Sequence, residues 1–209
     1  MASVIIAHKV IFRPRTLALV ISPTQAQAKE LFRSVSRHIM DAGLSQNLKE
    51  DNALSCKLDN HSRVLALPGT QALRGYSPNL VILDEAAQVP DIIYDAIKPM
   101  LAVTGGRLVM MSTPYGKRGF FWDRYVNGNP GDGYERYEVP ATQCERISVE
   151  FLDRECAAMN PWMYRQEYEC LFSDTVDSFF DSSLVEAAVD YTLKPLFEAP
   201  VAFGVRRLT

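Results

Sequence analysis

The sequence lacks a strong charge imbalance, a paired-cysteine metal motif and a long apolar run. Its formal net charge of -3 gives no general nucleic-acid signature, so a contact with DNA would need a local basic patch. Its four cysteines have no Cys-x-x-Cys spacing and its three histidines do not cluster with them, which favours free thiols in a reducing cytosol over a zinc site. No apolar stretch approaches the roughly 18–20 residues that cross a bilayer, and no signal peptide is visible. We therefore expect a cytoplasmic protein without membrane association.

The rest of the composition is that of an ordinary globular protein. Of the 209 residues, 47% are hydrophobic and 22% are charged. This length is typical of one large domain, or of one domain with an appendage, and it suffices for a sizeable core.

The most informative stretch is an apolar run that ends in two carboxylates. Leu80, Val81, Ile82 and Leu83 precede Asp84 and Glu85. A short, continuous apolar run is typical of a buried strand in a parallel sheet, and such sheets bind ligands beyond the carboxyl ends of their strands. One carboxylate at that edge can hold a metal ion through water while the other activates a water, as NTP hydrolysis requires. The alternative is that both residues only cap the next helix.

A second polar turn follows the next apolar run. Residues 107–111 are predicted to form a buried strand, after a helix that contains Ile93 and Ile97 and ends at the two glycines 105 and 106. The strand leads into Ser112, Thr113 and Pro114. In a parallel sheet these hydroxyls reach the same edge as the carboxylates, although a simple Ser/Thr turn also explains them. Lys117 and Arg118 open the next helix, where they either meet phosphates of a nucleotide or DNA or simply face solvent.

An earlier strand–turn–helix unit has clear signals at both ends. Residues 16–21 read as a strand, Thr24 and Gln27 form a capping box, and Gly43 ends the helix. Ser22, Thr24 and Gln25 would then lie on the carboxylate edge, where contact with nucleotide or DNA competes with simple capping. Arg74, just before the carboxylate strand, either reaches a phosphate or, as we favour from sequence alone, pairs with a surface carboxylate.

The other elements follow from their local patterns. We expect residues 63–67 to form a strand that pairs with 54–58, residues 44–62 to be otherwise irregular, and residues 134–139 to form a strand near a sheet edge. Helices are expected over 148–159, 162–170 and 183–191, the second opened by Asn160 and Pro161.

Three stretches together resemble the large subunit of tailed-phage terminases. They are Asp84-Glu85-Ala86-Ala87, the turn from Ser112 to Gly119, and Ser22-Pro23-Thr24-Gln25 followed by Glu30-Leu31-Phe32. The resemblance covers roughly residues 1–190 and concerns the ATPase half of that protein. It implies an α/β fold of the P-loop NTPase type (RecA-like, with an additional strand), in which a mainly parallel sheet is flanked by helices in three layers. By this likeness, residues 2–12 correspond to the helix that follows the phosphate-binding loop.

The resemblance also implies a function. The family is a motor that uses ATP and Mg²⁺ to move double-stranded DNA into a prohead, working as a homo-oligomeric ring at the portal protein, with a small terminase subunit, in the host cytoplasm. By that likeness Asp84 would hold Mg²⁺ through water and Glu85 would activate the attacking water. Ser112, Thr113 and Pro114 would couple hydrolysis to movement, and Arg74 would stand near the nucleotide.

Two family features are missing from the sequence. It contains no Gly-x-x-x-x-Gly-Lys-Ser/Thr loop, and it stops where a nuclease domain of the ribonuclease-H type should begin. We therefore expect residues 1–190 to be an incomplete ATPase domain and 191–209 a linker. We expect the chain alone to bind no nucleotide tightly.

Two alternative functions remain open. One is a fragment of a superfamily 2 helicase-like ATPase, which would need a second set of buried strands. The other is a non-catalytic module that binds DNA or a partner and has lost nucleotide binding.

Overall fold

The structure is a computed structural model that describes residues 1–44, 48–70, 73, 75–128, 131–173 and 188. The chain divides into two units at Ser173, and all elements named below belong to the first, Met1–Ser173. The predicted helix over 183–191 and the predicted domain boundary at residue 190 lie outside the described residues, apart from residue 188.

A six-stranded sheet forms the centre of the first unit, in the order β2-β3-β4-β1-β5-β6. The strands are β1 (Leu17–Ser22), β2 (Leu48–Asp51), β3 (Ser55–Leu58), β4 (Arg63–Pro68), β5 (Leu80–Asp84) and β6 (Arg107–Met111). Strands β4, β1, β5 and β6 run parallel, whereas β3 pairs antiparallel with β4 and β2 with β3. The mainly parallel sheet and the pairing of 54–58 with 63–67 are confirmed. Strand β2 was not predicted.

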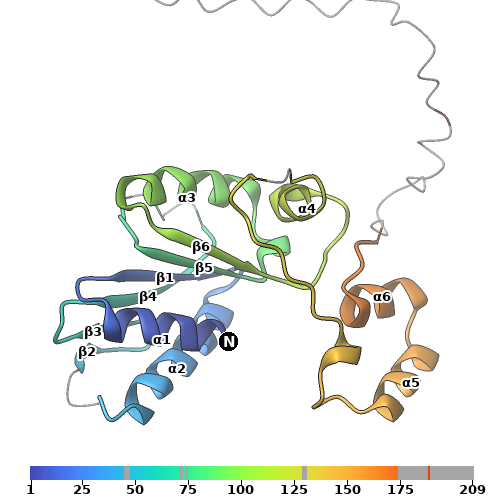
Figure 1. Ribbon diagram of the computed structural model, residues 1–209, viewed down its shortest axis with the longest axis horizontal. Coiled ribbons are helices and arrows are strands. Elements are labelled where there is room, and N and C mark those ends of the chain that lie inside the picture. Colours follow the sequence, from blue (N-terminus) through green and yellow to red (C-terminus); the bar gives the residue numbers. More distant parts are fainter. Residues whose placement is uncertain (45–47, 71–72, 74, 129–130, 174–187, 189–209) are drawn as a thin grey trace, which may run out of the picture. The chain divides into compact units, whose positions relative to one another are not determined.

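Helices cover both faces of this sheet (Figure 1). The described helices are α1 (Ala2–Phe12), α2 (Gln25–Asp41), α3 (Asp91–Thr104), α4 (Gly119–Val126), α5 (Val149–Ala158) and α6 (Pro161–Glu169), with short 3₁₀ turns η3 (Ala86–Gln88) and η4 (Ala141–Gln143). Helices α1 and α2 pack on one face in a core cluster that includes Ile6 and Phe32. Helices α3 and α4 pack on the other, where Ile97 and Phe120 belong to a second cluster. The three layers predicted from sequence are confirmed.

The central strands are apolar throughout because both of their faces are covered. In β1, Ala18 and Val20 face the α1–α2 cluster, while Leu19 and Ile21 face the α3–α4 cluster. Side chains alternate in the same way along β5. Such strands read as continuous apolar runs instead of alternating patterns, and this made them recognisable in the sequence.

The local signals at helix ends also hold. The Thr24 side chain accepts the backbone N–H of Gln27, whose side chain accepts the N–H of Thr24, which completes the predicted capping box. Gly43 follows the end of α2 with a φ of 75°, as a residue in the left-handed conformation does. Asn160 caps α6 through the N–H of Trp162, and Pro161 is its first residue.

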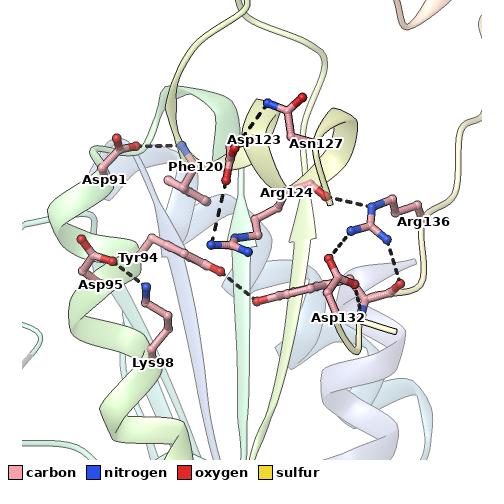
Figure 2. Close-up of polar contacts among 11 residues, drawn as sticks. Asp91, Tyr94, Asp95, Lys98, Phe120, Asp123, Arg124, Asn127, Asp132 and Arg136 are labelled. Carbon is pink, nitrogen blue, oxygen red and sulfur yellow. Dashed lines mark hydrogen bonds and ion pairs between the residues drawn. The ribbon is translucent and has the colours of Figure 1, made fainter. Parts of the chain in front are cut away.

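The strand expected over residues 134–139 is wrong, because this segment belongs to no sheet. Its side chains tie it to α3 and α4 instead (Figure 2). The hydroxyls of Tyr134 and Tyr94 are 2.9 Å apart, and the Arg136 guanidinium donates to the carbonyls of Arg124 and Tyr134. Alternating polarity arises here from contacts with a helical layer, which the sequence pattern does not distinguish from a sheet.

Among the described helices, none has both the length and the apolar character needed to cross a bilayer.

Candidate functional site

Two carboxylates and two serine hydroxyls meet at the carboxyl ends of β1, β5 and β6. Ser22 Oγ donates to Asp84 Oδ2 over 3.4 Å, and Ser112 Oγ donates to Glu85 Oε2 over 3.5 Å. The prediction that these four side chains share one edge of the sheet is confirmed. Both contacts are long for hydroxyl–carboxylate hydrogen bonds, so the hydroxyls hold the carboxylates only loosely.

Strand register explains why the residues pair in this way. Ile21 is the register partner of Leu83, so the next positions, Ser22 and Asp84, lie side by side. Asp84 is likewise the partner of Met111, which brings Glu85 beside Ser112. Because successive side chains alternate between faces, Ser22 and Asp84 continue the α1–α2 side, whereas Glu85 and Ser112 continue the α3–α4 side. The two carboxylates thus have different surroundings, as their adjacency in the sequence suggested.

Glu85 has a strained backbone. Its φ of 51° and ψ of 46° place a non-glycine residue in the left-handed region, which costs of order 1–3 kcal/mol and is common at functional sites. The conformation turns the chain from β5 into η3, and the Ser112 hydroxyl accepts the N–H of Ala87 across this turn at 3.2 Å. Helix α3 therefore begins only at Asp91, so neither carboxylate is its N-cap. The helix-capping alternative is wrong for α3.

Burial raises the pKa of both carboxyl groups. For Asp84, loss of hydration dominates and the hydrogen bond from Ser22 opposes it. For Glu85, burial is again the largest cause, the charge of Asp84 raises the pKa further, and the Ser112 hydrogen bond lowers it. Two half-buried, adjacent carboxylates are poorly accommodated without a nearby positive charge.

The donor atoms suit a hard cation that keeps much of its water. Carboxylate and hydroxyl oxygens are the ligands that Mg²⁺ prefers, and in NTP-hydrolysing sites one or two carboxylates commonly act together with substrate phosphates. No group of three or more His, Cys, Asp or Glu residues in the described part of the chain has the geometry to hold a metal ion by itself. The carboxylate edge therefore fits a cation that is shared with a bound phosphate better than it fits a closed protein cage.

The other predicted site residues have varied positions. The Thr24 hydroxyl is engaged by Gln27 in the capping box, and Gln25 is exposed on the first turn of α2. Thr113 and Pro114 follow Ser112 directly, and Pro114 is buried. Arg74 lies outside the described residues.

Lys117 and Arg118 are exposed before α4. Arg118 lines a hollow of about 350 Å³ between α3 and α4, together with Tyr94 and Trp122, and this hollow does not include Asp84 or Glu85. Arg118 thus lies on the α3–α4 side of this connection and not in the carboxylate cluster itself.

Two contributors were missed from the sequence. The charge of Glu167, on α6, raises the pKa of Glu85, although the two residues lie far apart in the chain and the sequence pattern of this helix indicates packing only. Asp91, at the start of α3, accepts the N–H of Phe120 at 2.9 Å and so caps α4 (Figure 2). Neither residue has a local motif, because each acts through a tertiary contact.

Comparisons with known proteins agree with this geometry. No protein-family model matches the chain. The curated large terminase subunits of Thermus phage G20c and Thermus virus P23-45 are each 25% identical to it in an alignment of 188 residues, and the alignment covers 80% of this chain. The chain is thus similar in sequence to phage large terminase subunits. It spans only 38% of the length of these two relatives.

Solved terminase structures share the fold. The ATPase domain of the Thermus phage P74-26 large terminase, as a point mutant, superposes with a TM-score of 0.72 at 22% identity, covering 82% of both chains. The large terminase of another thermophilic bacteriophage, solved in complex with ADP, gives a TM-score of 0.69 at 13% identity and covers 82% of this chain and 44% of that one. The P-loop NTPase-like α/β fold predicted from sequence is confirmed.

Proposed function

We propose that the chain supplies the carboxylate edge of the ATPase in a phage DNA-packaging motor. The observation that carries the proposal is the pair of contacts Ser22–Asp84 and Ser112–Glu85, which sets two consecutive carboxylates in different surroundings at the end of one strand. Relatedness to large terminases supports the same conclusion. The large terminase of a thermophilic bacteriophage has been solved with ADP and with ATP-γ-S, and we extend nucleotide use to the protein that contains this chain.

Each carboxylate has one role in this proposal. Asp84, which accepts a long hydrogen bond from Ser22, would hold the water shell of Mg²⁺, and the metal would neutralise charge on the phosphates when bound. Glu85, which accepts a long hydrogen bond from Ser112, accepts a proton from the attacking water. Its raised pKa brings the carboxylate closer to the range in which a general base works well.

The turn after β6 connects this edge to the rest of the fold. Ser112 contacts Glu85 and the N–H of Ala87, and the chain then passes through Thr113 and buried Pro114 into α4. We assign to Ser112, Thr113 and Pro114 the coupling of ATP hydrolysis to movement, because a shift of Glu85 during hydrolysis would reach α4 through them. Lys117 and Arg118, exposed on the same connection, are proposed contacts for phosphates of nucleotide or DNA.

The proposed partners, in the host cytoplasm, are double-stranded DNA, a small terminase subunit, a portal protein and further copies of the same protein in a ring.

The helicase-like alternative needs a second set of buried strands, and residues 120–128 and 131–173 contain none.

Nucleotide affinity tests the first part of the proposal. The sequence contains no Gly-x-x-x-x-Gly-Lys-Ser/Thr, so the 209-residue chain lacks the loop that cradles the β- and γ-phosphates. We expect it to bind ATP weakly and to show little turnover. Magnesium-dependent turnover by the 209-residue chain that Glu85→Ala abolishes would contradict this expectation.

The gene gives the complementary test. We expect in-frame codons for a phosphate-binding loop within a few dozen codons upstream of residue 1, and we expect a protein expressed with them to hydrolyse ATP. A promoter and ribosome-binding site directly upstream, without such codons, would favour the non-catalytic binding module instead.

A further inference from the structure

The opposite edge of the sheet, at the amino ends of the parallel strands, gathers positive charge. Arg13 and Arg15 lie just before β1, Arg63 opens β4 and Arg107 opens β6. Lys9, in the last turn of α1, completes the group. The four arginines are exposed and Lys9 is partly exposed. We call these five residues the amino-end rim.

Backbone hydrogen bonds fix the rim in place. The carbonyl of Asn79, just before β5, accepts both Lys9 Nζ at 3.2 Å and the N–H of Arg107 at 3.1 Å. The N–H of Arg63 donates to Thr16, and the N–H of Arg15 donates to Asn60. These links come from separate segments of the chain, so the fold sets the backbone positions of these residues.

The positive charges of the amino-end rim are not balanced by ion pairs within the described part of the chain. Burial lowers the pKa of Lys9, and the neighbouring charges of Arg107 and Arg13 lower it further. None of the five forms an ion pair with a carboxylate in the described part of the chain. Cations near the ends of α1 and α3 complement the helix dipoles, but Arg15 and Arg63 lie at no helix end.

We propose that the amino-end rim binds the phosphate backbone of double-stranded DNA. This inference rests on the proposed function, because it names the surface through which the motor ATPase would contact its polymer. In a chain with net charge -3, a local basic surface is what DNA binding requires.

The dimensions of the rim suit this ligand. Strands in a sheet are spaced about 4.8 Å apart, so the three steps from β4 to β6 place Arg63 and Arg107 about 14 Å apart, with Arg13 and Arg15 between them. One DNA strand presents a phosphate about every 3.4 Å along the helix axis, and because the backbone also winds around that axis, a straight rim of this length reaches roughly two or three phosphates. DNA bound there would lie at the other end of the strands from Asp84 and Glu85, which leaves the carboxylate edge free for nucleotide.

The test measures binding of a labelled duplex of about 30 base pairs to the 209-residue chain by fluorescence anisotropy, from about 50 to 200 mM salt. The rim variant is the triple change Arg13→Gln, Arg63→Gln and Arg107→Gln. The matched control is Lys29→Gln, Arg33→Gln and Arg37→Gln on α2, which removes the same charge from another surface of the fold. Thermal unfolding verifies that each variant folds. If the rim variant does not fold, the single change Arg63→Gln is measured in its place.

We expect the rim variant to lose roughly tenfold or more in affinity at about 100 mM salt, and the control less than about threefold. Each lost phosphate contact should reduce the slope of log affinity against log salt by about 0.9, so the rim variant loses roughly 2–3 units of slope and Arg63→Gln alone about one.

Equal losses in the rim and control variants, or no loss in the rim variant, would overturn the proposal. Absence of duplex binding by the unmodified chain at the lowest salt would overturn it too. ATP turnover by a protein that includes a phosphate-binding loop, which tests the proposed function, is measured independently of these outcomes.

Discussion

Ser112 Oγ lies 3.5 Å from Glu85 Oε2, although 27 residues separate them in the chain. The contact exists because β5 and β6 are register partners up to Asp84 and Met111, so the next residue of each strand meets the other. The same rule pairs Ser22 with Asp84 on the other face of β5. The candidate site is therefore a direct product of parallel strand register, and each of its features gives a measurable expectation.

Neutralising Asp84 should stabilise the protein when no divalent cation is present. The variant Asp84→Asn removes a half-buried charge whose pKa is raised by burial. We expect its melting temperature at pH 7 to exceed that of the unmodified chain by about 1–3 °C, a modest change for a chain of this size. The matched control, Asp95→Asn, alters an exposed carboxylate that pairs with Lys98 and should bring no gain.

The pH dependence of this gain follows from the sign of the pKa shift. A carboxyl group with a raised pKa in the folded state favours folding while it is protonated and loses that contribution as the pH rises through its folded pKa. The advantage of Asp84→Asn should thus be largest at neutral pH and shrink toward the ordinary pKa of 3.8. An advantage that grows as the pH falls would contradict the burial of this group.

The start of α4 should depend on Asp91. Its carboxylate accepts the N–H of Phe120 at 2.9 Å and acts as a cap supplied by another helix. Asp91→Ala should lower the free energy of unfolding by about 1–2 kcal/mol, the usual cost of losing a charged cap. Urea unfolding measures this cost. Asp95→Ala, which breaks only an exposed ion pair with Lys98, should cost less than about 0.5 kcal/mol, and equal costs for the two variants would refute the capping role.

The two tyrosines that join the 134–139 segment to α3 offer a spectroscopic test. Burial raises the pKa of Tyr134 to about 12, and the hydrogen bond with Tyr94 raises it as well (Figure 2). In Tyr94→Phe, the pKa of Tyr134 should move toward the ordinary value of 10. Phenolate absorbance, followed from about pH 9 upward, reports the titration. An unchanged titration curve would mean that the two hydroxyls do not interact in solution.

Two neighbouring glycines before β6 should respond differently to substitution. A Cβ at Gly106 would lie 2.5 Å from the carbonyl oxygen of Pro78, whereas one at Gly105 would meet nothing within 4 Å, although its φ is 61°. Gly106→Asn should cost at least about 2 kcal/mol through steric overlap. Gly105→Asn should cost less than about 1 kcal/mol, because asparagine tolerates the left-handed conformation. Thermal unfolding distinguishes the two, and a reversed order would contradict the close packing of Gly106.

The sheet and the carboxylate edge were predictable because their signals are local. Apolar runs that end in polar residues mark buried parallel strands, and the rule that such strands share a carboxyl edge is enough to bring Ser22, Asp84 and Ser112 together. The capping box at Thr24 fixed the start of α2 for the same reason.

What the sequence did not reveal depends on tertiary contacts. Strand β2 is too polar to resemble a strand, and it forms because β3 offers an edge for it. The alternation over 134–139 resembles a strand but reflects contacts with α3 and α4. The influence of Glu167 on Glu85 arises only when α6 folds back near the carboxylate edge. No local pattern encodes such an approach.

The most direct test of the central claim is magnesium-dependent ATP turnover by a protein expressed with the expected upstream codons for a phosphate-binding loop. We predict that Glu85→Gln reduces kcat by about 10²–10⁴-fold, as expected for loss of a general base. Glu167→Gln, which alters a nearby charge without removing the base, should change kcat by less than about tenfold. Turnover that persists in Glu85→Gln, or that Glu167→Gln reduces as strongly, would contradict the assignment of Glu85 as the group that activates water.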